Sequence, residues 1–400
     1  MIRKPLREKE FIALCALMMA MIAIAIDAML PALSEIGHTL SPDTPERAPL
    51  VIAFYVFGMG VGTLFVGPMS DTLGRRPVLL FGTGLYCVAA IICWRTDSFE
   101  MLLLARILQG VGVAGPRVVT QAIIRDLYHG EKMAKVVSFM MMIFVLVPAV
   151  APAMGQLVMI NFGWRAIFLT FVLFALILGT WFFIRQPETL AVDQRRPFTF
   201  TSFISASREM MSIHMVRVSI IVQTLTLGML FSMISLVQPM FEFTYGRGDD
   251  FAMWFAGLAL IAGTANLVNA RLVERLGMRP LATFGYLIQC VFAALALILA
   301  VTGQLHFLLF VVWILSLFYM VGFTLGNLNA LAMEPLGHIA GIASSVIGAV
   351  STIGGAIVSA VVGITFTGTV TPLAVTCLLC SVSAVVLMRS IANEERVKLT

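Results

Sequence analysis

The chain has 400 residues, of which 60% are apolar and 12% charged, with a formal net charge of +5. Soluble domains contain about 25% charged residues, so the composition excludes a soluble globular protein and indicates an integral membrane protein. The apolar runs are continuous rather than alternating, which also excludes an outer-membrane barrel.

A helix needs about 20 apolar residues to cross a bilayer. The sequence contains twelve such runs, six in each half, and we expect an all-α membrane protein with twelve transmembrane helices in two pseudo-symmetric six-helix bundles. In chain order, the runs begin near Phe11, Ala48, Pro77, Phe99, Ala134, Arg165, Val218, Phe251, Leu281, Phe307, Ile339 and Pro372.

The first run, 11–33, follows a basic start, as in a signal peptide. It is too long for the apolar part of such a peptide and has no convincing cleavage site, so we expect a retained first helix. A polar stretch at 35–47 and another at 242–250 are expected to be external loops.

One long connector, residues 185–216, separates the halves. We expect an N-terminal six-helix bundle at 1–184, a cytoplasmic linker at 185–216 and a C-terminal bundle at 217–400. The remaining connections leave no room for a soluble catalytic domain, and no ATP-binding or hydrolase motif is visible. We therefore expect no enzyme activity.

Lys and Arg are distributed unequally between the two expected faces of the membrane. The face that holds both termini carries 20 of them, whereas the opposite face carries four: Arg47, Arg95, Arg165 and Arg247. Because positive loops stay inside, both termini are expected in the cytoplasm. The basic pI of about 9.0 then reflects topology and not nucleic-acid binding.

A short segment occurs twice. The stretch Asp71–Pro77 recurs as Glu274–Pro280, 203 positions later, with acid, Leu, Gly, Arg and Pro in the same places. An offset of half the chain indicates two structural repeats of the same run of spans, an architecture typical of transporters.

The first copy, within Gly67-Pro-Met-Ser-Asp-Thr-Leu-Gly-Arg-Arg-Pro77, resembles the loop 2–3 motif of the major facilitator superfamily. The resemblance implies the twelve-helix major facilitator fold. It also implies a polar clasp on the cytoplasmic face, made by Asp71, Arg75 and Arg76 next to turns at Gly67 and Gly74. The acid Asp126, at the end of span 4, is expected to pair with these arginines.

Further motifs resemble drug:proton antiporters of the bicyclomycin and chloramphenicol resistance (Bcr/CflA) type. Span 1 carries Asp-x-x-Leu-Pro-Ala-Leu from Asp27, and span 4 carries Arg-x-x-Gln-Gly from Arg106. Span 5 resembles the antiporter motif through Pro152 and Gly155, although Val147 and Ala151 stand where that motif has glycines. The resemblance implies a conformational role for this part of span 5.

Asp27 and Arg106 are the candidate proton-coupling residues. A carboxylate deep in an apolar helix is costly, and burial favours its neutral form, as a reversible proton carrier requires. Arg106 stays charged, so it cannot carry the proton but could control the charge of Asp27. A structural role for either residue remains open. Arg117, further along span 4, is expected to snorkel to the headgroups.

Candidate substrate-binding residues are those that suit an adaptable, mainly apolar wall with a few hydrogen-bonding groups. Bonding between helices is the alternative role for the polar members. The set comprises Tyr55, Met141, Phe144, Gln223, Gln238 and Asn327.

The resulting hypothesis is a secondary transporter, working as a monomer, that exports lipophilic or amphipathic drugs in exchange for protons by alternating access. A proton-coupled exporter of an endogenous amino-acid or sugar derivative is the alternative. No cofactor or metal is expected. One proton falling through about 100 mV and one pH unit supplies about 3.7 kcal/mol, enough for a roughly 500-fold gradient of a neutral cargo.

Overall fold

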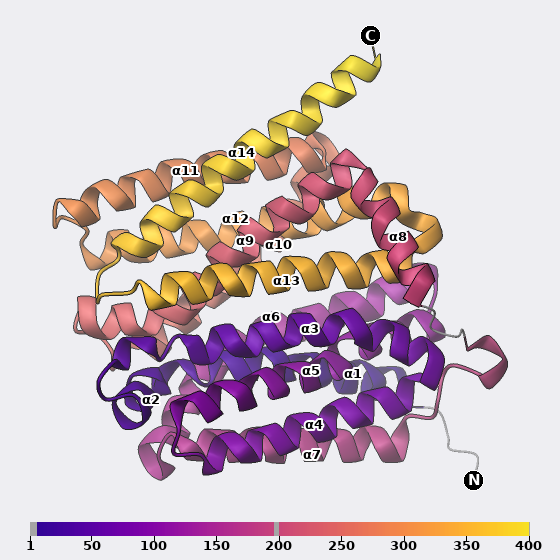
Figure 1. The fold of residues 1–400 in the computed structure, drawn as a ribbon, viewed down its shortest axis with the longest axis horizontal. Coiled ribbons are helices and arrows are strands. Elements are labelled where there is room, and N and C mark those ends of the chain that lie inside the picture. Colours follow the sequence, from indigo (N-terminus) through magenta and orange to yellow (C-terminus); the bar gives the residue numbers. More distant parts are fainter. Residues whose placement is uncertain (1–5, 196–199, 400) are drawn as a thin grey trace. The chain divides into compact units, whose positions relative to one another are not determined.

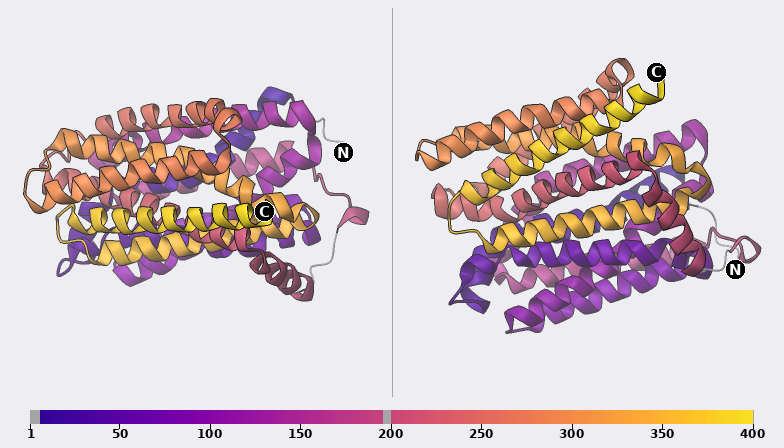
Figure 2. Two further views of the ribbon diagram at one scale, coloured as in Figure 1. Left: turned by 90° about the horizontal axis from the view of Figure 1, so that it is seen from above. Right: turned by 45° about the horizontal axis from the view of Figure 1, so that its top comes forward.

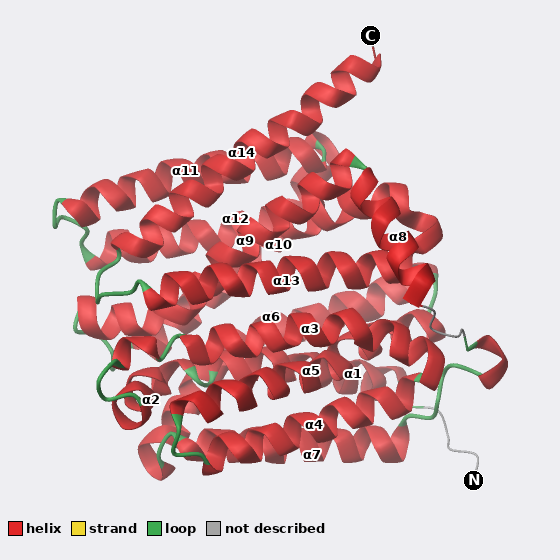
Figure 3. Cartoon of the chain, in the orientation of Figure 1, coloured by secondary structure: helices red, strands yellow, loops and turns green. Residues whose placement is uncertain are grey.

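The computed structural model describes residues 6–195 and 200–399. Figure 3 shows helices joined by loops and turns, and no strand occurs in this described part. Twelve of its α-helices have 20 or more residues, so the expected all-α fold with twelve long helices is confirmed. Arg3, Lys4, Arg196 and Pro197, which the sequence-based topology uses, lie outside the described residues.

Hydropathy gives eleven candidate membrane spans in the described chain. One of them, Phe307–Ile364, is 58 residues long and comprises two long helices, α12 and α13, joined by a 3₁₀ turn (Glu334–Ile339). The candidate spans and the twelve long helices therefore agree.

The chain divides into two compact units. Unit 1 contains Met1–Pro45 and Phe54–Ser202, and unit 2 contains Glu46–Ala53 and Phe203–Thr400. In Figures 1 and 2, the long helices of unit 1 run side by side as one bundle. They are α1 (Glu8–Asp27), α3 (Leu50–Leu73), α4 (Arg75–Arg95), α5 (Phe99–Leu127), α6 (Gly130–Phe162) and α7 (Arg165–Arg185).

Unit 2 repeats this plan with six long helices (Figure 1). The helix α9 packs against α12, α13 and α14, and α11 packs against α12 and α14. The bounds are α9 (His214–Pro239), α10 (Phe251–Leu276), α11 (Met278–Val301), α12 (Phe307–Met333), α13 (Ala340–Ile364) and α14 (Thr371–Leu399).

Two segments expected to be connections contain helices. The 35–47 stretch includes most of α2 (Leu33–Leu40) and a 3₁₀ turn (Pro45–Arg47), and the connector includes α8 (Phe200–Ser212). α2 is amphipathic, since Leu33 and Ile36 are buried while Glu35 is not. The polar composition of these two segments therefore did not indicate their short helices, which bury only one face.

The first helix is interrupted, in contrast to the continuous run expected from hydropathy. α1 ends at Asp27 and is followed by a 3₁₀ turn (Leu30–Ala32) before α2. Pro31 explains the position of the break, because a proline ring clashes with the carbonyl of the residue four positions earlier, here Asp27. The acid is therefore the last residue of α1.

Small residues bring α4 and α5 of unit 1 into close contact. A Cβ on Gly82 would lie 2.6 Å from the carbonyl oxygen of Gly112, and one on Gly112 would lie 2.5 Å from the amide nitrogen of Tyr86. Such backbone contact is how membrane helices associate without a hydrophobic driving force between them. It fixes the position of α5, which carries Arg106.

Candidate functional site

Asp27 is buried at the end of α1, with 4% of its surface exposed. α1 packs against α5, α6 and α7 of the same unit. In the described part of the chain, the Asp27 carboxyl forms no hydrogen bond or ion pair, including with Arg106. An unpaired buried acid is costly when charged, so the surroundings favour a proton on it or a partner supplied in another state.

Arg106 of α5 is fully buried and reaches the broken end of α1. Its Nη2 donates to the carbonyl oxygen of Ala25 (3.0 Å), and its Nη1 donates to Oε1 of Gln109 (2.8 Å). The Met29 amide donates to Ile26 (3.2 Å), a 3₁₀ pattern that leaves the Ala25 carbonyl to the guanidinium. Arg106 therefore caps the helix terminus, where the helix dipole favours a cation.

Tyr55 of α3 lies against the same guanidinium. Its ring centroid is 4.3 Å from Cζ of Arg106, a cation–π geometry. Tyr55 is fully buried, and its hydroxyl has no hydrogen-bond partner in the described structure. Asp27, Arg106 and Tyr55 thus belong to neighbouring elements of unit 1, joined through Ala25 and the cation–π contact.

Gly155 of α6 lies against the turn after Asp27. A Cβ at Gly155 would be 2.0 Å from the carbonyl oxygen of Ala28, so only glycine allows this approach. Pro152 lies one turn earlier within α6 and removes one backbone donor from that helix. The span 5 residues implied by the family resemblance therefore adjoin the break that carries the acid.

A polar clasp forms around Arg75, the first residue of α4. Its Nε donates to Oδ2 of Asp126 (3.0 Å), and its Nη1 donates to Oγ of Ser70 (2.8 Å) and to Oδ1 of Asp71. Ser70 in turn donates to the carbonyl of Gly67 (2.9 Å). The clasp joins the ends of α3, α4 and α5.

The backbone before Arg75 requires glycine. Gly74 has φ 103°, a conformation that residues with a side chain rarely adopt. A Cβ there would also lie 2.7 Å from Oε2 of Glu188. Arg76 follows in α4, where its Nη2 donates to the carbonyl of Phe183 in α7 (2.8 Å) and its guanidinium lies over that ring.

Glu188 completes the clasp and was not singled out from the sequence. Its Oε1 accepts from the backbone amide of Arg75 (2.9 Å) and its Oε2 from that of Arg76 (3.0 Å), so it caps α4 where Gly74 has no side chain. The next residue, Thr189, donates to Asp126 (3.0 Å). The only sequence signal was an acid immediately after Pro187, which closely follows α7.

The residues of α6 that were predicted to form an apolar wall differ in their exposure. Met140 is buried (1% exposed), whereas the predicted Met141 is 40% exposed and Phe144 is partly exposed. Met140 and Met141 are adjacent on the helix and point about 100° apart. Met141 is therefore turned away from the buried side chain of Met140, whereas Phe144, four residues after Met140, leaves the same side of α6.

The polar candidates of unit 2 differ in how well they are bonded. Asn327 donates to Oδ1 of Asn269 (2.9 Å) and to the Phe323 carbonyl (2.8 Å), as expected for bonding between helices. Gln238 donates to Oε2 of Glu242 (2.7 Å), but its Oε1 has no partner in the described residues. Gln223 is buried with its Nε2 unpaired there.

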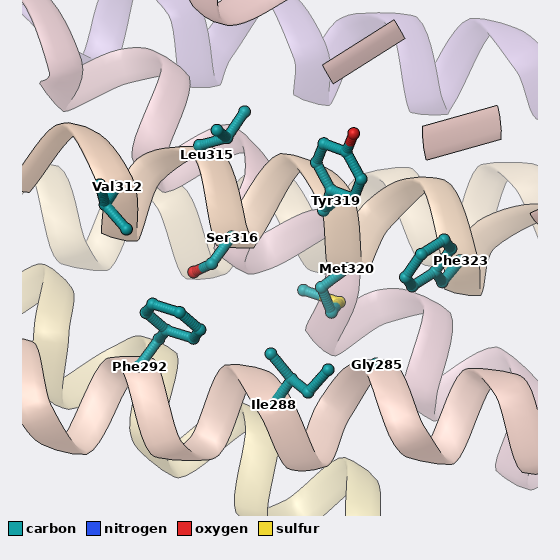
Figure 4. A pocket seen from close by; sticks show the side chains of 9 residues that line it. All are labelled: Gly285, Ile288, Phe292, Val312, Leu315, Ser316, Tyr319, Met320 and Phe323. Carbon is teal, nitrogen blue, oxygen red and sulfur yellow. The ribbon is translucent and has the colours of Figure 1, made fainter. Parts of the chain in front are cut away.

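A cavity of about 280 Å³ opens between α11 and α12. Figure 4 shows Ile288 and Phe292 of α11 extending towards α12. Met320 and Phe323 line the same cavity from α12. Its walls are almost entirely apolar, and none of the predicted substrate-binding residues lines it.

The described residues contain no group of three His, Cys, Asp or Glu side chains able to hold a metal ion. The cysteines are free thiols, five of them buried. The chemistry available to the site consists of a buried acid, a guanidinium and hydrogen-bonding groups in apolar surroundings.

The fold and site define a transporter rather than an enzyme, and the comparisons agree. The sequence profile of the Major Facilitator Superfamily matches residues 12–359. The chain belongs to this superfamily.

Within it, the chain is similar to proteins named for multidrug resistance and for bicyclomycin resistance. It is 28% identical over 329 residues to the multidrug resistance protein MdtL of Shewanella sp. (strain ANA-3), covering 79% of this chain and 76% of that one. It is 27% identical over 265 residues to a bicyclomycin resistance protein homolog of Haemophilus influenzae, covering 66% of each chain.

Solved structures share the fold at low sequence identity. The xylose transporter XylE of E. coli, in a partially occluded inward-open conformation, superimposes with a TM-score of 0.74 at 13% identity, over 95% of this chain and 96% of XylE. The human organic anion transporter MFSD10 gives 0.65 at 16% identity, over 96% and 100% of the two chains.

Proposed function

We propose that this protein is a monomeric exporter of lipophilic or amphipathic drugs, driven by protons through alternating access in a bacterial inner membrane, with both termini in the cytoplasm. The drug-resistance relatives support drug export. The observation that carries proton coupling is the buried carboxyl of Asp27, which forms no bond in the described structure and ends a helix capped by Arg106.

The coupling follows from the geometry of the α1 break. A proton on Asp27 removes a charge from apolar surroundings, whereas loss of the proton creates a carboxylate that needs a cation. Arg106 is the nearby candidate, since it binds the Ala25 carbonyl, two residues before the acid. Deprotonation would draw the guanidinium from its cap towards Asp27, and reprotonation would let it return. Protonation thereby acts on the packing of α1, α5 and α6.

The test uses proteoliposomes with an imposed pH gradient, in which candidate drugs are added while lumenal pH is followed. Wild type should release protons in response to some drugs, whereas Asp27→Asn should give no drug-dependent signal while remaining folded. Asp249→Asn, an acid-to-amide change in an exposed loop, is the matched control and should behave as wild type.

The outcomes separate the parts of the proposal. Full proton movement in Asp27→Asn would place coupling elsewhere. Silence of the folded wild type across a broad lipophilic panel would favour the alternative cargo, an endogenous amino-acid or sugar derivative. The unpaired amide atoms of Gln223 and Gln238 favour that alternative, because they suit a polar cargo.

A further inference from the structure

Arg117 is a second guanidinium in α5 that neither the clasp nor the α1 break uses. It lies eleven residues after Arg106, which is about three helical turns, so both side chains leave the same face. In the described chain it forms no ion pair, and its Nη1 is buried without a hydrogen-bond partner. A buried donor left unpaired is costly, which makes this group unusual.

The position of Arg117 does not suit snorkelling. Leu108 lies nine residues before Arg117, which is about two and a half helical turns. The Arg117 side chain therefore leaves the side of α5 opposite to Leu108, whose side chain is 44% exposed. It lies ten residues before Leu127, the end of α5, roughly 15 Å away along the axis. Helical side chains point towards the N-terminus of their helix, so the guanidinium points away from that nearer end.

Tyr55 provides a second unpaired donor on the side of α5 that carries Arg106 and Arg117. Its hydroxyl also lacks a hydrogen-bond partner in the described structure. Arg106, stacked on the Tyr55 ring, adds a second positive charge. Two buried donors without acceptors, in the field of two guanidinium groups, are complementary to an anion with several oxygen atoms.

We propose that Tyr55 and Arg117 form a subsite for the acidic group of the cargo, so that the exported compounds include amphipathic carboxylates. This inference rests on the export function proposed above and specifies its substrate class. Arg117 binds the carboxylate, and the Tyr55 hydroxyl donates a further hydrogen bond. The apolar part of the cargo lies in the membrane-embedded region around this subsite.

The test compares two ligands that differ only in the acidic group, 1-naphthylacetate and 1-naphthylacetamide, by calorimetric titration of the protein in lipid nanodiscs. Wild type should bind the carboxylate more tightly than the amide. Arg117→Gln should weaken carboxylate binding about tenfold or more and leave amide binding within about twofold. Arg117→Lys should retain part of the preference, and Tyr55→Phe should weaken carboxylate binding by a few-fold. Arg95→Gln, at the exposed end of α4, is the matched charge control and should have no effect.

Three results would overturn the subsite: a wild type that does not prefer the carboxylate, equal weakening of both ligands in Arg117→Gln, or no change in that variant. Folding is checked by thermal unfolding, and Tyr55→Phe gives an independent reading if Arg117→Gln is unstable. Testing wild-type proteoliposomes with neutral drugs distinguishes a failure of the export function from a failure of the subsite. No export of any drug would overturn the export function, whereas export without carboxylate preference would overturn only the subsite.

Discussion

Replacing Glu188 by alanine removes the carboxylate that binds the first two amides of α4. Both hydrogen bonds, at 2.9 and 3.0 Å, have a charged acceptor at a helix N-terminus, and the preceding Gly74 cannot replace them. Loss of a cap costs about 1 kcal/mol, and loss of the charge near the helix dipole adds several tenths. Because Glu188 is only partly buried, we expect a local cost of about 1–2 kcal/mol.

Hydrogen exchange measures this cost directly at Arg75 and Arg76. A local loss of about 1–2 kcal/mol should speed exchange of peptides covering the start of α4 by about 5–30-fold, with smaller changes elsewhere. Glu131→Ala is the matched control, since Glu131 lies in the first turn of α6, is exposed and makes no hydrogen bond in the described structure. Unchanged exchange at α4 in Glu188→Ala would refute the capping role.

Two further predictions concern stability. Gly155→Ala should destabilise the protein by about 1–3 kcal/mol in thermal unfolding, because the new Cβ meets the Ala28 carbonyl. Gly84→Ala, a helical position with nothing within 4 Å of the new Cβ, should instead stabilise it by about 0.5–1 kcal/mol; equal effects would contradict the close approach. Asn327→Ala should cost about 1 kcal/mol through its lost bond to Asn269, with drug transport retained. Loss of transport from a stable variant would return Asn327 to the substrate-binding set.

The sequence predicted the twelve long helices because a membrane span has a length and composition that can be recognised locally. It did not predict which side of a helix is buried, because a helix that is apolar all round carries little directional signal. Met140 and Met141 show the result, since adjacent and chemically identical side chains differ in exposure from 1% to 40%.

The site was predicted unevenly for a related reason. Asp27 and Arg106 could be found because a charge in an apolar run is conspicuous, and the break after Asp27 could have been read from Pro31, four residues later. Glu188 could not be recognised as a cap, because its partners at Arg75 and Arg76 are more than 110 positions earlier. Likewise, the bond from Asn327 to Asn269 joins residues 58 positions apart, which no local pattern contains.

The cap at Glu188 also indicates that the start of the connector belongs to the first half of the protein. Glu188 and Thr189 lie after α7, yet they complete the clasp of unit 1. A fragment ending at Arg185 would keep every long helix of this half and still lack the acceptor for the start of α4. The stretch just after α7 is thus a C-terminal extension of the first repeat, and two co-expressed halves would each be self-sufficient only if the division came after it.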